Sequence, residues 1–219
     1  LGVQQLAVGV KAGPQILAIG AKLIAEQEDG NIIMSPDFKN FFNTCSRQMM
    51  IESIEEEPLM RPFLKIMSLD LYYEPVIYTQ SSNGQIAPST LHSVDGSQQG
   101  NILAQIQSCF MLKNFLRTMD QTAQELARIH DGQGAARAIT DDVSVTCPRG
   151  AAREMWQAMK AACQNMGMEF NDKGRMWSPS GIYPLDMLDM PVGKAMDKDG
   201  NIIGPGEGLK VAGIPIGDD

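Results

Sequence analysis

The chain has 219 residues, 43% of them hydrophobic and 20% charged, which is enough for one sizeable core in a globular domain. No apolar run is long enough for a transmembrane helix, and the amino end shows no signal-peptide pattern. The formal net charge is −8, from 18 Lys and Arg against 26 Asp and Glu. This balance argues mildly against a nucleic-acid partner, because proteins that neutralise phosphates usually carry a basic surface.

The cysteines give no sign of a metal site or of disulfides. They lie far apart, with no Cys-x-x-Cys pair and no neighbouring histidine: Cys45, Cys109, Cys147 and Cys163. We therefore expect an intracellular, reducing environment, and neither a zinc centre nor a disulfide framework.

The first half of the chain predicts helices and short strands in alternation. Apolar residues at helical spacing predict a helix from Gly13-Pro14 to Glu28, and the apolar run 32–34 predicts a short buried strand that leads to Asp37. Further elements expected here are helices over 46–55 and 58–69, a hairpin over 76–84 that turns at Asn83-Gly84, and a long helix over 102–116.

The second half continues the same alternation. The expected elements are strands at 136–140 and 143–145 separated by Asp141-Asp142, a helix over 149–166, short strands near 168–170 and 175–177, and loop with weak strands over 180–208. This order predicts an α+β domain in which helices cover one face of a small antiparallel sheet.

Three carboxylates stand at the ends of these apolar strands. Asp37 follows one strand, and Asp141 and Asp142 lie between two others. If the strands are neighbours, the three acids converge on one sheet edge, where like charges raise one another's pKa. Two Mg²⁺ ions, which Mn²⁺ can replace, relieve such repulsion in sites of nucleotidyl transfer. The alternative is an ordinary Asp-Asp turn beside an unrelated strand-end Asp.

The motifs around these acids follow the order of a known family. The chain resembles the palm of a reverse transcriptase, particularly of the non-LTR retroelement type. The resemblance runs through Asp37-Phe38-Lys39-Asn40-Phe41-Phe42-Asn43, then Gly96-Ser97-Gln98-Gln99-Gly100-Asn101, then Ala138-Ile139-Thr140-Asp141-Asp142. A fourth motif is similar at 167–177, the segment 209–217 resembles the strand that follows it, and Gln5 to Val10 resembles the segment that precedes the first motif.

The resemblance implies a right-hand polymerase palm. Its core would occupy about residues 30–217 of a domain spanning 1–219, with partial fingers and no complete thumb. The chain lacks an initiating Met and stops directly after a strand-like segment, so we expect it to be a fragment of a longer protein. Each motif alone is weak, but five motifs in the family's order are specific.

The resemblance also implies metal-binding roles. Asp37 and Asp141 would be the carboxylates that bridge two Mg²⁺ ions, and Asp142 would be an accessory ligand. The backbone carbonyl of Phe38 would complete one coordination sphere.

Four further residues would act on the nucleotide. Phe42 stands where the family places an aromatic gate against a ribose 2′-hydroxyl. Gln99 and Gly100 would let the backbone approach nucleotide and template, and Lys173 would steady or protonate the leaving pyrophosphate. The alternatives without a functional role are core packing for Phe42, an ordinary helix-start loop for Gln99 and Gly100, and a solvated surface side chain for Lys173.

The implied activity is RNA-dependent DNA synthesis by a two-metal mechanism. The partners would be an RNA template, a DNA primer and deoxynucleoside triphosphates, with no membrane, and the location would be nuclear for a eukaryotic retroelement. Phe41, Asn101-Ile102 and Ile139 depart from the family pattern. Two alternatives therefore stay open: a catalytically degenerate palm acting as a scaffold or RNA-binding relic, and an RNA-dependent RNA polymerase. The terminal Asp218-Asp219 pair is expected to lie outside the site.

Overall fold

The computed structural model describes residues 4–7, 9–27, 30–73, 78–88, 95–97, 101–184, 189–196 and 202–217. Its helices are α1 (Gly13–Glu26), α2 (Phe41–Thr44), α3 (Arg47–Glu55), α4 (Leu64–Tyr72), α5 (Ile102–Ile129) and α6 (Ala152–Asn165), with short 3₁₀ turns at Arg61–Phe63 and Arg149–Ala151. Its strands are β1 (Asn31–Ser35), β2 (Tyr78–Gln80), β3 (Ile86–Pro88), β4 (Ala135–Ile139), β5 (Asp142–Pro148), β6 (Arg175–Trp177), β7 (Lys194–Met196), β8 (Ile202–Val211) and β9 (Ile214–Gly217).

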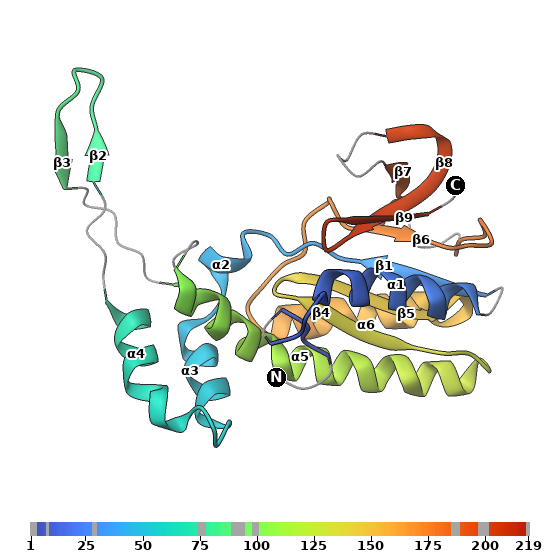
Figure 1. Cartoon of the computed structure of the whole chain (residues 1–219), viewed down its shortest axis with the longest axis horizontal. Coiled ribbons are helices and arrows are strands. Elements are labelled where there is room, and N and C mark those ends of the chain that lie inside the picture. Colours follow the sequence, from blue (N-terminus) through green and yellow to red (C-terminus); the bar gives the residue numbers. More distant parts are fainter. Residues whose placement is uncertain are drawn as a thin grey trace.

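The central sheet has four strands in the order β4-β5-β1-β6, and every adjacent pair is antiparallel. A three-stranded sheet, β7-β8-β9, lies beside it, and the hairpin β2–β3 stands away from the body (Figure 1). The α+β class and the small antiparallel sheet backed by helices are thus confirmed. In the part of the chain that is described, no helix is long and apolar enough to span a bilayer.

Helices cover both faces of the central sheet, so the prediction of one covered face is wrong. Figure 1 shows α1 on one side of the sheet and α5 and α6 on the other. Ile32 and Met34 belong to the core formed with α5 and α6, whereas Ile33 between them packs into a second core with α1. Because successive strand residues face opposite sides, a strand buried on both faces shows a continuous apolar run without alternation. The buried face of α1 consists of small residues and one leucine: Leu17, Ala18, Ala21 and Ala25.

Three predicted boundaries also need correction. The hairpin turn is formed by Thr140 and Asp141, and Asp142 is already the first residue of β5. Helix α5 runs on to Ile129, because Met119 and Leu126 extend its buried stripe beyond the predicted end. The region predicted as loop with weak strands contains the ten-residue strand β8, which is stabilised by pairing with β7 and β9 in spite of its glycines.

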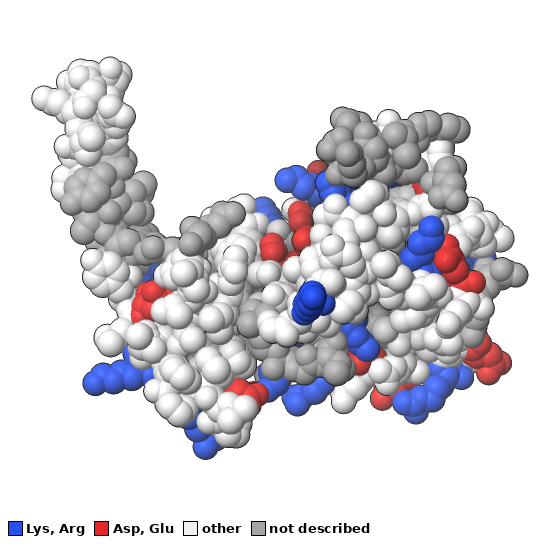
Figure 2. Space-filling view, viewed as in Figure 1, with Lys and Arg blue, Asp and Glu red and all other residues white. Residues whose placement is uncertain are grey.

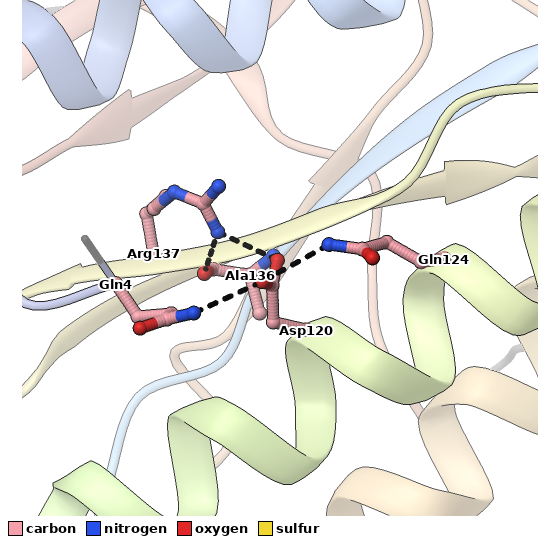
Figure 3. Close-up of polar contacts among 5 residues, drawn as sticks. All are labelled: Gln4, Asp120, Gln124, Ala136 and Arg137. Carbon is pink, nitrogen blue, oxygen red and sulfur yellow. Dashed lines mark hydrogen bonds and ion pairs between the residues drawn. The ribbon is translucent and has the colours of Figure 1, made fainter. Parts of the chain in front are cut away.

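One buried carboxylate joins three elements beneath the sheet. Asp120 of α5 accepts hydrogen bonds at one oxygen from the Ala136 N–H (3.0 Å) and the Arg137 guanidinium (2.6 Å), and at the other from Gln4 and Gln124 (3.1 Å each) (Figure 3). Burial by itself would raise the pKa of Asp120, but the hydrogen bonds outweigh it and hold the pKa below its ordinary value. The hydrogen bonds of Asp120 therefore fix β4 and the amino-terminal segment to α5.

Replacing Asp120 by Asn should destabilise the fold in a pH-dependent way. At pH 7 we expect a loss of about 1–3 kcal/mol in the free energy of unfolding, because buried donors lose a charged acceptor. A depressed pKa contributes stability that is present above the ordinary pKa and disappears as the pH falls through the folded value. The gap between the two proteins in urea unfolding should therefore shrink between pH 7 and pH 3.

Asp131 supplies the matched control. It is exposed and has a φ of 52°, a conformation that Asn tolerates well, so Asp131→Asn removes the same charge without touching the core. Its stability should stay near that of the unmodified chain at both pH values. An Asp120→Asn penalty that is equal at pH 7 and pH 3 would contradict the assigned role.

Candidate active site

The pairing of β1 with β5 brings the predicted acids together. Met34 lies opposite Val145, and three more residues along each strand lead to Asp37 and Asp142. The Ser35 hydroxyl donates to the Val143 carbonyl (3.3 Å), so the two strands stay adjacent up to the last residue of β1. The expected proximity of the strand that leads to Asp37 and the hairpin that carries the acidic pair is confirmed.

Asp37 and Asp142 line one cavity of about 380 Å³. Three basic side chains, Lys173, Arg175 and Lys210, line it as well, and its remaining wall comes from Ser35, Pro36, Gly193, Gly208 and Leu209. In Figure 2, acidic side chains gather in the hollow between the β2–β3 hairpin and the lobe of β7–β9, with basic ones beside them. The cavity thus combines carboxylates with cations within one small volume.

Asn171 holds Asp37 in place at this cavity. Its side-chain amide donates to the Asp37 carboxylate, and its backbone N–H donates to the Asp37 carbonyl (2.8 Å). The Asn171 side-chain oxygen accepts from the backbone N–H of Lys173 (2.7 Å). One residue therefore fixes the acidic and the basic side of the site relative to each other.

The three acids act on one another electrostatically. Burial, followed by the charge of Asp37, raises the pKa of Asp141 above its ordinary value. Loss of solvent and the charges of Asp141 and Asp37 raise the pKa of Asp142. Burial and the charge of Asp141 raise the pKa of the Cys109 thiol on α5 to about 11. Asp141 is not among the residues that line the 380 Å³ cavity, although its charge helps to raise the pKa of Asp142, which does line it.

The aromatic residues of the first motif lie mainly in the core. The Phe38 ring is buried among Phe41, Phe115 and Phe170, so any role of Phe38 at a metal would come from its backbone. Phe42 is half-buried and packs edge-on against Phe41, with ring centroids 5.3 Å apart, and it does not line the cavity.

The glycine loop of the second motif is attached to the first motif. The N–H groups of Gly96 and Ser97 donate to the carbonyls of Cys45 (3.0 Å) and Phe42 (2.7 Å). Gly96 has a φ of 76°, and a Cβ there would lie 2.4 Å from the Phe42 oxygen, so only glycine fits. Gln99, Gly100, Asp218 and Asp219 lie outside the described residues.

The donor chemistry suits a hard divalent cation. Within the described ranges, no three His, Cys, Asp or Glu side chains are placed closely enough to hold a metal ion, and one Asp37 oxygen is turned to the Asn171 amide. The potential metal ligands of the site are nevertheless all carboxylate oxygens. Asp37 and Asp142 line the cavity, and Asp141 is close enough to Asp37 for their charges to interact. Oxygen donors of this kind are the ligands that Mg²⁺ prefers.

Three residues of the site were missed by the sequence analysis: Asn171, Arg175 and Lys210. The sequence does contain a signal for Asn171, because an Asn followed by Asp-Lys-Gly is typical of a turn capped by the Asn side chain. Arg175 and Lys210 belong to strands of two different sheets, β6 and β8, and only the tertiary fold brings them together.

No protein-family model matches the chain, and no curated protein is significantly similar to it. The site therefore has to be interpreted from its own geometry and from the motifs in the sequence.

Removing one of the crowded charges should stabilise the chain at neutral pH. A carboxyl with a raised pKa binds its proton more tightly when folded, so it costs stability as the pH rises through the interval above its ordinary pKa. Asp141→Asn should therefore raise the Tm at pH 7 by on the order of 2 °C. The gain should vanish at pH 3, and Asp131→Asn should show none. A lower Tm for Asp141→Asn at pH 7 would contradict the repulsion.

Proposed function

We propose that the chain is a polymerase palm that extends a DNA primer on an RNA template with deoxynucleoside triphosphates. The observation that carries this proposal is that Asp37 and Asp142, brought together by the β1–β5 pairing, line one cavity with three basic side chains. Natural folds rarely crowd carboxylates at the cost of stability unless the site uses them. The reverse-transcriptase resemblance of the surrounding motifs supports the choice of reaction.

The acidic side of the cavity would bind the metal ions. Asp37 and Asp142 line it, the charge of Asp141 acts on Asp142, and Asn171 fixes the orientation of the Asp37 carboxylate. When two divalent ions are bound, they supply charge neutralisation and activation of the attacking hydroxyl. Bound cations would also relieve the repulsion that raises the pKa of Asp141 and Asp142.

The basic side of the cavity would bind phosphates. Lys173, Arg175 and Lys210 face the carboxylates across a volume of about 380 Å³. The Arg175 guanidinium is held by the carbonyls of Asp172 (2.7 Å) and Gly174 (2.8 Å), which orients it before any ligand arrives. Preorganised cations of this kind stabilise the charge that develops on a leaving pyrophosphate.

A degenerate palm is the second candidate. The observation that favours it is the hydrogen bond from Asn171, which occupies an Asp37 oxygen that a metal would need. In that case the chain would act as a scaffold or RNA-binding relic, and its acids would bind no divalent ion.

Primer extension tests the proposed activity. With poly(rA)·oligo(dT), dTTP and Mg²⁺ or Mn²⁺, the 219-residue chain should elongate the primer. Asp142→Asn should lower the rate by about 100-fold or more, because a cavity carboxylate that neutralises a metal is lost. Asp131→Asn removes the same charge at a distance from the cavity and should retain full activity.

Metal binding separates the active palm from the degenerate one. Electron paramagnetic resonance of Mn²⁺ should detect a site that Asp37→Asn and Asp142→Asn weaken and that Asp131→Asn leaves intact. A chain that binds no Mn²⁺ through these carboxylates and does not extend primers would favour the scaffold. Full activity in Asp142→Asn would exclude the assigned site.

Phe42 distinguishes a DNA-making from an RNA-making enzyme. If Phe42 excludes the ribose 2′-hydroxyl, Phe42→Ala should reduce discrimination against ribonucleotides by about tenfold or more, measured as the ratio of kcat/KM for dTTP and UTP. Phe42→Tyr keeps the ring and should keep the discrimination. Equal use of dTTP and UTP by the unmodified chain would instead favour an RNA polymerase.

A further inference from the structure

The turn that carries Asp141 contains a strained residue. Thr140 has a φ of 53°, in the left-handed region that β-branched residues rarely occupy. Ile139 and Asp142 are the last paired residues of the hairpin, so Thr140 and Asp141 form its loop and lie beyond the ladder. A strained residue persists only where its surroundings hold it, and such residues concentrate at functional sites.

The side chain of Gln5 holds both backbone groups of Thr140. The Gln5 amide nitrogen donates to the Thr140 carbonyl (3.1 Å), and the Thr140 N–H donates to the Gln5 side-chain oxygen (3.0 Å). The same oxygen accepts from the Ala7 N–H (3.2 Å). Gln5 is only 1% exposed, so these bonds form away from competing water.

Gln5 is itself fixed to the sheet edge. The Leu6 N–H donates to the Ala138 carbonyl and the Ala138 N–H donates to the Gln4 carbonyl (2.8 Å each), which makes residues 4–6 a short parallel neighbour of β4. The Gln4 side chain is bonded to Asp120 of α5 (Figure 3). The two adjacent glutamines therefore have separate partners: the Gln4 side chain binds the buried Asp120 carboxylate, and the Gln5 side chain binds the Thr140–Asp141 turn.

We propose that Gln5 is a positioning residue, whose buried amide locks the Thr140–Asp141 turn and thereby sets where the Asp141 carboxylate stands relative to Asp37 and Asp142. The Thr140 carbonyl belongs to the peptide plane that leads into Asp141. The Thr140 N–H belongs to the preceding peptide plane, so Gln5 holds the planes on both sides of the Thr140 Cα and thereby restrains the φ and ψ rotations that would otherwise swing Asp141 away. This role rests on the proposed function, in which Asp141 contributes to metal binding.

The test compares Gln5→Met with Gln4→Met. Both changes remove a side-chain amide from the same segment, so both should lower the Tm, but only Gln5→Met should expose the Thr140 amide to rapid hydrogen exchange. Mn²⁺ affinity should fall about tenfold in Gln5→Met, as for other residues that orient metal ligands, and stay near the unmodified value in Gln4→Met.

A rescue variant separates positioning from folding. Asn adopts the left-handed conformation more readily than Thr, so Thr140→Asn should restore part of the Mn²⁺ affinity when combined with Gln5→Met. Because Thr140→Asn also relieves strain and so stabilises the fold, the Mn²⁺ affinities are compared at a temperature at which circular dichroism shows every variant fully folded. Equal Thr140 exchange and equal Mn²⁺ affinity in Gln5→Met and Gln4→Met would overturn the positioning role.

Failure of the proposed function would look different. In that case Asp141→Asn and Asp142→Asn would leave Mn²⁺ binding and primer extension unchanged. If those two variants lose Mn²⁺ affinity while Gln5→Met keeps it, the metal site is supported and the positioning role of Gln5 is excluded.

Discussion

The antiparallel pairing of β1 with β5 is the interaction on which the candidate site depends. It is an apolar pairing, with Ile32, Ile33 and Met34 buried on both sides of the sheet, and its register alone decides which residues meet beyond the strand end. A slip of one residue would turn Asp37 or Asp142 to the opposite face. The hydrophobic core thus fixes the relative position of two charged groups that repel each other.

That repulsion distinguishes the site from Asp120, the buried carboxylate that α5 places against the same sheet. Asp120 is buried more deeply than Asp141, yet donors from three elements hold its pKa down, whereas burial and the charges of neighbouring acids raise the pKa of Asp141 and Asp142. The fold therefore compensates the burial of one carboxylate with four donors and leaves the other two with a raised pKa. Sites that trade stability for chemistry commonly show this contrast.

Local patterns were sufficient to predict the helices α1 and α3, strand β1 and the hairpin β4–β5, since each depends on periodicity, a cap or a turn within a few residues. They could not show that α1 covers the second face of the sheet, because its buried side is mostly alanine while Ile16 and Ile19 are exposed. Nor could they place Arg175 and Lys210 beside Asp37. Those positions follow from the pairing of distant strands, which no local pattern records.

The net charge of −8 illustrates the same limit, because it describes the whole chain while a ligand meets only one cavity. That cavity is lined by three basic and two acidic side chains, Lys173, Arg175 and Lys210 against Asp37 and Asp142. Divalent ions at the acids would make it strongly positive, which is the field that a triphosphate and a nucleic-acid backbone need. Under the proposed function, metal binding would be the step that enables an acidic protein to hold a polyanion.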